Sequence, residues 1–256
     1  MPQSIRSMFV FAVLSVFLAA PLAAQDAPHR LSEMWTMVPK ADQSKDFYDG
    51  LKAHMEMRAE LGDPRTWDAY TPMLGDELNI VGVRSCCFNW ADMDAYRKWS
   101  EENSAVNDHF QSHVAPHVES YAHYIDEISW VNSNWKSDWG PYRFFGATQF
   151  KLKPGHAGTF DAARDKISQI AINQGWATEE HPWIWSRQVG SLTESIVVPY
   201  RNFADMEPGE QNFFDFLSNV LGSDEAADAL FKDLTSGVEE QSYQIWELNE
   251  NLSMDR

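Results

Sequence analysis

The chain has 256 residues, of which 38 are Asp or Glu and 20 are Lys or Arg, so its formal net charge is −18 at pH 7. This excess of negative charge repels nucleic-acid backbones and anionic membrane surfaces, so we expect neither as a partner. The length fits one large domain or two small ones.

The N-terminus is typical of a cleavable secretory signal. Arg6 precedes an apolar run from Met8 to Ala20, and small residues follow as far as Ala24. The run is shorter than the roughly 20 residues that a membrane-spanning helix needs. We therefore expect residues 1–24 to be removed and the mature chain to be periplasmic or secreted, without membrane insertion. The alternative is an uncleaved N-terminal anchor.

Strand and helix patterns alternate after the signal. A short β-rich stretch ends at Pro39, and apolar residues at helical spacing then follow between Asp42, a candidate N-cap, and Gly62, a candidate C′ residue. Two further β-rich stretches flank a turn. The predicted elements are a strand over 31–38, a helix over 43–61, and strands over 66–74 and 78–88.

The third predicted strand carries the only two cysteines, Cys86 and Cys87. Adjacent side chains on a strand point to opposite faces, and a bond between them requires strained geometry. We expect two reduced, buried residues that the protein can do without. An intermolecular bridge and a redox-active pair are the alternatives.

A pentapeptide occurs twice with one aromatic exchange, as NWADM at Asn89–Met93 and as NFADM at Asn202–Met206. Each copy follows a predicted strand and precedes a helical pattern. We interpret it as the joint between the third strand and the second helix, with Asp92 or Asp205 stabilising the start of that helix. A binding role for the two aspartates is the alternative.

The segments around the second pentapeptide repeat the order of those around the first. Pro199 falls within a strand of the second copy, where a bulge or local break is expected because proline cannot donate to a ladder. A polar linker that carries Trp135 and Trp139 joins the copies, and these rings either cover the end of the fold or stack on a ligand. We predict repeats over 31–133 and 142–252, the second with strands at 144–152, 182–189, 195–203 and 240–249 and helices at 157–174 and from 213.

Each copy therefore has the order β-α-β-β-α-β, which is ferredoxin-like. Two such units in one chain resemble the dimeric α+β barrel superfamily, in particular its antibiotic-monooxygenase, NIPSNAP and stress-response barrel groups. The resemblance implies an α+β fold in which two sheets form an intramolecular barrel with the helices outside. It also implies a monomer with pseudo-two-fold symmetry.

Histidines at helical spacing are the strongest candidates for chemistry. His109 and His113 lie four residues apart, so they share a helix face beside the apolar residues Phe110 and Val114. A neutral imidazole exchanges protons near pH 7, which makes both candidate acid/base residues. They could also hold a metal or form a solvated helix edge. Because one helix supplies only two nitrogens, we favour direct ligand contact and predict no metal and no cofactor.

Arg84 and Trp99 are the candidate ligand-binding residues. Arg84 lies inside a strand pattern, where a buried guanidinium needs an acceptor such as a ligand carboxylate or a partner Asp or Glu. Trp99 lies on the apolar stripe of the same predicted helix, and the histidines lie at the edge of that stripe.

Three functions remain open from sequence. The first is an exported enzyme that acts on a small hydrophobic or aromatic molecule, for which the resemblance suggests a cofactor-free oxygenase. The second is a non-catalytic protein that binds a small ligand such as a sugar or haem. The third is a structural scaffold, which a barrel filled by apolar side chains would favour.

Overall fold

The computed structural model describes residues 29–136 and 141–254. The predicted signal peptide, residues 1–24, and Trp139 lie outside the described residues. Among the helices that are described, none combines the length and apolarity needed to cross a membrane.

The described part of the first half of the chain contains four strands and three α-helices. The helical pattern predicted after the first pentapeptide is divided by the structure at Asn103 and Ser104. The elements are β1 (Leu31–Pro39), α1 (Ser44–Glu60), β2 (Asp68–Leu74), β3 (Val81–Phe88), α2 (Trp90–Glu102), α3 (Ala105–His113) and β4 (Val118–Ile128), with a 3₁₀ turn at Ala115–His117.

The second half has the same order of strands. Its elements are β5 (Phe144–Leu152), α4 (Ala157–Asn173), β6 (Ile184–Gln188), β7 (Thr193–Tyr200), α5 (Phe213–Leu221), α6 (Asp224–Thr235) and β8 (Val238–Leu248), with 3₁₀ turns η2 (Trp130–Asn132) and η3 (Ala204–Met206). The predicted repeat boundaries, 31–133 and 142–252, remain predictions.

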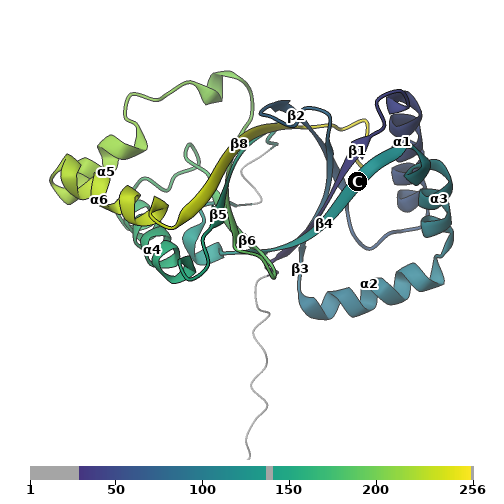
Figure 1. The fold of residues 1–256 in the computed structure, drawn as a ribbon, viewed down its shortest axis with the longest axis horizontal. Coiled ribbons are helices and arrows are strands. Elements are labelled where there is room, and N and C mark those ends of the chain that lie inside the picture. Colours follow the sequence, from purple (N-terminus) through teal and green to yellow (C-terminus); the bar gives the residue numbers. More distant parts are fainter. Residues whose placement is uncertain (1–28, 137–140, 255–256) are drawn as a thin grey trace, which may run out of the picture.

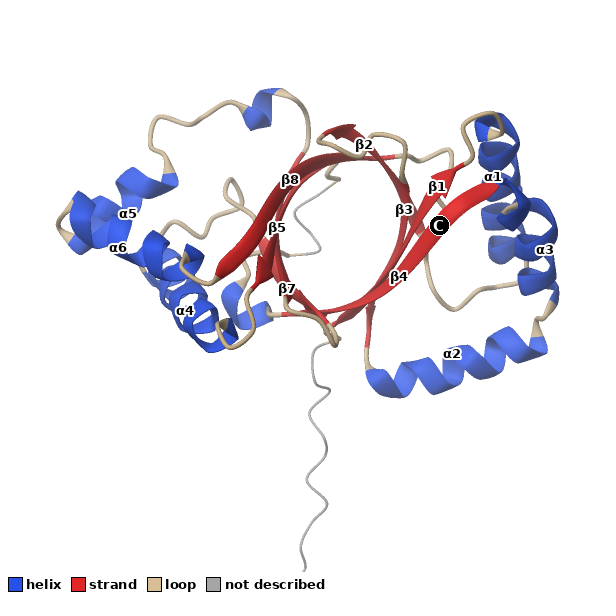
Figure 2. Ribbon diagram, viewed as in Figure 1, coloured by secondary structure: helices blue, strands red, loops and turns tan. Residues whose placement is uncertain are grey.

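The eight strands form a closed antiparallel barrel in the order β1-β3-β2-β8-β5-β7-β6-β4. Each half supplies four neighbouring strands, and the halves join where β2 pairs with β8 and β4 with β6. Figure 1 shows α1, α2 and α3 outside the ring on one side and α4, α5 and α6 on the other. Figure 2 shows the same helical layers in blue around the red strands. The predicted α+β barrel fold is confirmed.

The two apolar cores lie outside the ring, between the strands and the helices. In the first half, Met37, Val81 and Val83 pack against α1 residues such as Phe47 and Leu51. In the second half, Phe150 and Trp185 pack with Phe160 on α4 and Leu217 on α5. Since neighbouring strand residues face opposite ways, the residues between them face the inside of the barrel.

Local signals explain how the helices end. Gly62 follows the last turn of α1 with φ 69° and Gly175 follows α4 with φ 88°, a conformation that glycine adopts without steric cost. The predicted N-cap of α1 was wrong by one residue. The cap position is Gln43, whose side chain makes no capping hydrogen bond.

The two pentapeptides each join their Asn and Asp by a capping hydrogen bond, but the bonds differ and so does the chain that follows. In the first, the backbone N–H of Asn89 donates to Asp92 Oδ2 over 2.7 Å, and α2 begins at once. In the second, the backbone N–H of Asp205 donates to the Asn202 side chain over 3.2 Å, but only the short η3 follows. The next α-helix begins at Phe213. The interpretation as a strand-to-helix joint therefore holds directly for the first copy only.

The ends of β3 and β7 overturn two expectations. Cys86 and Cys87 are joined by a disulfide, and Cys86 is exposed, so the pair is neither reduced nor buried. The register of β3 against β1 shifts at this end, between Leu31 and Ser32. By contrast, the ladder between β7 and β5 passes through Pro199 without any shift. Proline is tolerated there because the β6 ladder reaches only Val197, so the far edge of β7 is unpaired at Pro199.

Candidate functional site

The structure places the four predicted site residues in three separate regions. His109 and His113 lie on α3, which packs against α1 outside the barrel. Trp99 lies on α2, where it stacks on Tyr96 at 5.7 Å between ring centroids. Arg84 follows Val83 on β3 and faces the inside of the barrel, on the opposite side of the sheet from the helices. The sheet therefore separates Arg84 from the two histidines.

A third histidine joins the predicted pair. The ring of His109 stacks on His113 at 4.3 Å and on His54 of α1 at 5.6 Å. The Nδ1 atoms of His54 and His109 are buried without a hydrogen-bond partner among the described residues. Burial lowers the pKa of His54 to about 3 and also lowers that of His109, so both rings are neutral at pH 7. No described group of three or more His, Cys, Asp or Glu residues is placed to hold a metal ion.

A buried carboxylate on the outer face of β1 forms the better-built site. Glu33 is 6% exposed and lies in a strand that is otherwise largely apolar. Its carboxylate is paired with the guanidinium of Arg65 and accepts a hydrogen bond from the Trp35 indole over 3.2 Å. A third contact joins it to His123 on β4, whose Nε2 lies 2.7 Å from Glu33 Oε1. Burial of this charge is tolerated because every partner is a donor.

Aromatic rings and a second charged pair hold Arg65 in place. Its guanidinium lies 4.0 Å from the ring centroid of Phe88 and 3.9 Å from that of Tyr96. Its backbone N–H donates to Asp63, which in turn pairs with Arg58 at 3.0 Å. Arg65 is consequently fixed before it contacts Glu33, and the carboxylate has one orientation.

His123 is the accessible member of this site. Its side chain is 36% exposed, and its ring stacks on Trp35 at 4.0 Å with an interplanar angle of 12°. Tyr121, two residues earlier on β4, is 59% exposed and lies 6.2 Å from the same indole. Together Trp35, Tyr121 and His123 form an aromatic surface that solvent can reach.

The hydrogen bond to Glu33 determines which nitrogen of the His123 ring donates a proton to the carboxylate. A carboxylate paired with a guanidinium only accepts, so Nε2 of His123 carries a proton and Nδ1 is the nitrogen left to take up another. No described residue donates to Nδ1. A base oriented by a buried carboxylate is an arrangement that can serve general-base catalysis.

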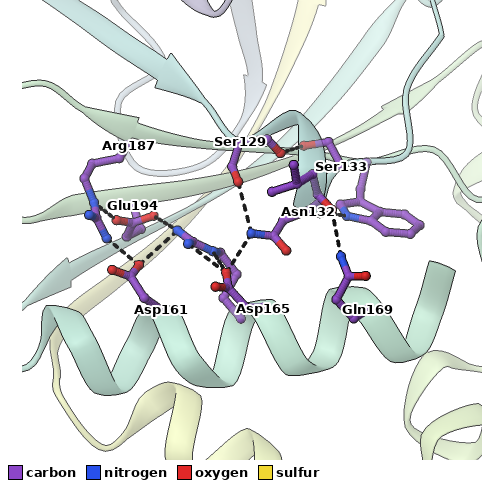
Figure 3. A network of polar contacts seen from close by, with 11 residues as sticks. Ser129, Asn132, Ser133, Asp161, Asp165, Gln169, Arg187 and Glu194 are labelled. Carbon is purple, nitrogen blue, oxygen red and sulfur yellow. Dashed lines mark hydrogen bonds and ion pairs between the residues drawn. The ribbon is translucent and has the colours of Figure 1, made fainter. Parts of the chain in front are cut away.

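The second half has a buried carboxylate of a different kind. Glu194 on β7 is 0% exposed and pairs with Arg187 of β6 and with Arg164 of α4. Figure 3 shows Arg187 and Asp161 beside Glu194, and Asp165 held by Asn132. The partners of this carboxylate among the described residues are arginines, so this network, unlike that of Glu33, holds no imidazole. It ties α4 to the sheet.

Sequence reasoning missed Glu33, Arg65 and His123. One signal was present, because Glu33 interrupts an apolar strand pattern at a position that shares a face with Leu31 and Met37. A charged residue there must meet a partner. The partner itself could not be identified, since His123 lies 90 positions away along the chain.

Comparison with known proteins supports the fold. No family model and no curated protein sequence matches the chain. Among solved structures, the chain is similar to a candidate monooxygenase from Lactobacillus acidophilus NCFM, with a TM-score of 0.53 and 7% identity over 86% of this chain and 94% of that one. A candidate monooxygenase from Fusobacterium nucleatum subsp. nucleatum gives a TM-score of 0.52 and 9% identity over 85% and 91%. At these identities the similarity shows the barrel fold alone.

Proposed function

We propose that this chain is an exported enzyme that removes a proton from a small hydrophobic or aromatic molecule, with His123 as the general base. The hydrogen bond between His123 and the buried Glu33 carries the proposal, because it orients an accessible imidazole. Export rests on the signal pattern of residues 1–24.

The surface around His123 suits a flat, apolar substrate. Tyr121 is an exposed aromatic ring beside the stacked pair of Trp35 and His123, and aromatic molecules pack on such rings in offset or edge-on contacts. When a C–H bond next to a carbonyl group is cleaved, its proton goes to Nδ1 of His123 and its electron pair stays on the substrate. Glu33 then stabilises the imidazolium.

Cofactor-free oxygenation is the reaction class that we favour. The carbanion left by proton removal can react with dioxygen, and conversion of a CH₂ group to C=O consumes one O₂ and releases one H₂O. The two structural neighbours described as candidate monooxygenases agree with this choice. Proton removal is nevertheless the step that the residues of this chain support directly.

Hydrogen–deuterium exchange tests the proton step without oxygen. We would incubate the mature protein with 2-tetralone, an aromatic ketone with acidic C–H groups, in D₂O under argon, and follow loss of the C–H signals by NMR. His123→Gln keeps a side-chain donor for Glu33 but removes the base, so we expect exchange to fall at least about 100-fold. Oxygen uptake in air would then be measured with the same variants.

The matched control is His113→Gln on α3. We expect it to exchange the substrate as the unaltered protein does. If His113→Gln loses exchange while His123→Gln retains it, the base lies on α3 as the sequence predicted. If neither variant differs from the unaltered protein, general-base catalysis by either histidine is wrong.

A further inference from the structure

A second site lies at the opposite half of the barrel, where β7 extends beyond β6. The β6–β7 ladder ends at the pair Ile184 and Val197, while β7 continues to Tyr200 against β5 alone. The segment before β6 passes the unpaired edge of β7 and leaves a pocket of about 170 Å³. Its apolar lining is Pro182, Val198 and Pro199, and its polar lining includes Tyr142, Glu180 and Asp205.

The buried hydroxyl of Tyr142 indicates that the pocket binds a ligand. The residue is 8% exposed, and its hydroxyl oxygen is buried without a hydrogen-bond partner among the described residues. A buried hydroxyl left unpaired is costly, so such groups are rare unless a ligand or water supplies the bond. Burial also raises the pKa of Tyr142, which keeps the phenol neutral and its oxygen able to accept.

The charges around the pocket select the ligand. Arg201 already pairs with Glu179 at 3.0 Å, and its guanidinium lies 5.3 Å from the Tyr142 ring centroid. Asp205 accepts one bond, from the backbone N–H of Arg201 over 2.9 Å, through only one of its oxygens. The carboxylate of Glu180 bonds to no other residue in the described part of the chain. Negative charge is therefore in excess, which disfavours an anionic ligand and favours a cationic one.

We propose that this pocket binds a short aliphatic primary amine as its ammonium ion. An ammonium group has three donors and no acceptor, which matches the acceptors of Glu180, Asp205 and Tyr142. The hydrocarbon part would lie against Pro182, Val198 and Pro199. Liquid water occupies about 30 Å³ per molecule, so the pocket has room for about five or six non-hydrogen atoms.

Titration with n-butylammonium chloride, followed by NMR or calorimetry, tests the proposal. Two probes of nearly equal size, 1-butanol and sodium butyrate, separate charge from hydrocarbon burial. We expect n-butylammonium to bind at a single site and neither of the other probes to bind measurably. Equal binding of 1-butanol or of butyrate would overturn the proposal.

Three variants locate the binding site. We expect Glu180→Gln to weaken n-butylammonium binding at least 10-fold and Tyr142→Phe to weaken it several-fold. Glu225→Gln, an exposed position on α6 outside the pocket, removes the same charge from the protein and should leave binding unchanged. If Glu225→Gln weakens binding as much as Glu180→Gln does, the amine is held only by the overall negative charge and the proposed site is wrong.

Discussion

The two halves of the barrel use equivalent ladder positions for different chemistry. In both, the first strand pairs with the last, and the register shifts at the end of the first strand, at Pro39 and at Leu152. Six residues before these two points, Glu33 in the first half occupies the position equivalent to Gly146 in the second. Four residues before them, the cross-strand pair of Trp35 and His123 is equivalent to the pair of Thr148 and Tyr243.

The second half replaces the acid–base pair by packed tyrosines. A Cβ atom on Gly146 would lie 2.6 Å from the hydroxyl oxygen of Tyr243, so the glycine makes room for this ring. Tyr243 hydrogen-bonds Tyr200, whose pKa burial raises to about 12. This position therefore holds a phenol, whereas its counterpart in the first half holds an imidazole. The same backbone thus supports a candidate active site in one half and a structural contact in the other.

Removal of each buried carboxylate gives the largest expected effect. Glu33→Ala leaves Arg65 buried without its ion-pair partner, whereas after Glu194→Ala both Arg164 and Arg187 still pair with Asp161. We expect Glu33→Ala to lower the free energy of unfolding by about 3–5 kcal/mol and Glu194→Ala to lower it by less, measured by urea denaturation. Only Glu33→Ala should also abolish the deuterium exchange of 2-tetralone in protein that remains folded. Loss of exchange in folded Glu194→Ala protein would contradict the assignment of chemistry to the first half.

Acid should destabilise the first half through His54. Its folded pKa of about 3 lies below the value of about 6.5 expected in the unfolded chain. Between these pH values the unfolded state binds a proton that the folded state does not, so stability falls as pH decreases through this window. The slope reaches about 1.4 kcal/mol per pH unit. Urea denaturation at several pH values would measure this slope. The variant His54→Leu should flatten this part of the profile of stability against pH. An unchanged slope in that variant would show that other groups cause the loss of stability.

A methyl group at Gly146 tests the packing of the second half. Gly146→Ala brings Cβ against the Tyr243 hydroxyl, and we expect a loss of about 1–3 kcal/mol from overpacking. In a Tyr243→Ala background the closest contact is removed and the Tyr200 ring, 3.2 Å from the added Cβ, remains, so the loss should become smaller. Equal losses in both backgrounds would mean that backbone conformation, rather than the tyrosine, requires glycine here.

The sequence predicted the fold much better than it predicted the site. Strand and helix order follows from periodicity and from turn residues such as Gly62 and Gly175, which act locally. The division of α2 from α3 was also local, at Asn103 and Ser104, but it was hidden by apolar residues that continue the helical spacing on both sides.

The candidate site depends on register, which period-two alternation does not specify. Glu33 meets His123 only because β1 pairs with β4 in one particular alignment. Arg65 reaches the same carboxylate from the loop between α1 and β2, where no periodic pattern exists. The sequence could therefore mark Glu33 as unusual, but it could not select His123 over His109 or His113.

The disulfide between Cys86 and Cys87 should have the smallest effect of these features. Cys86 in β3 and Pro199 in β7 occupy equivalent positions in their ladders with β1 and β5. Each half therefore ends its third strand with a residue that restricts the backbone. A bond between adjacent residues closes almost no chain, and the entropy that it removes from the unfolded state is correspondingly small. We expect replacement of both cysteines by serine to change the free energy of unfolding by about 1 kcal/mol or less, measured by urea denaturation.

The unaltered protein, denatured with and without a phosphine reductant, should show the same small difference. A loss of several kcal/mol would show that the pair fixes the end of β3 and, through Phe88, the ring that packs on Arg65.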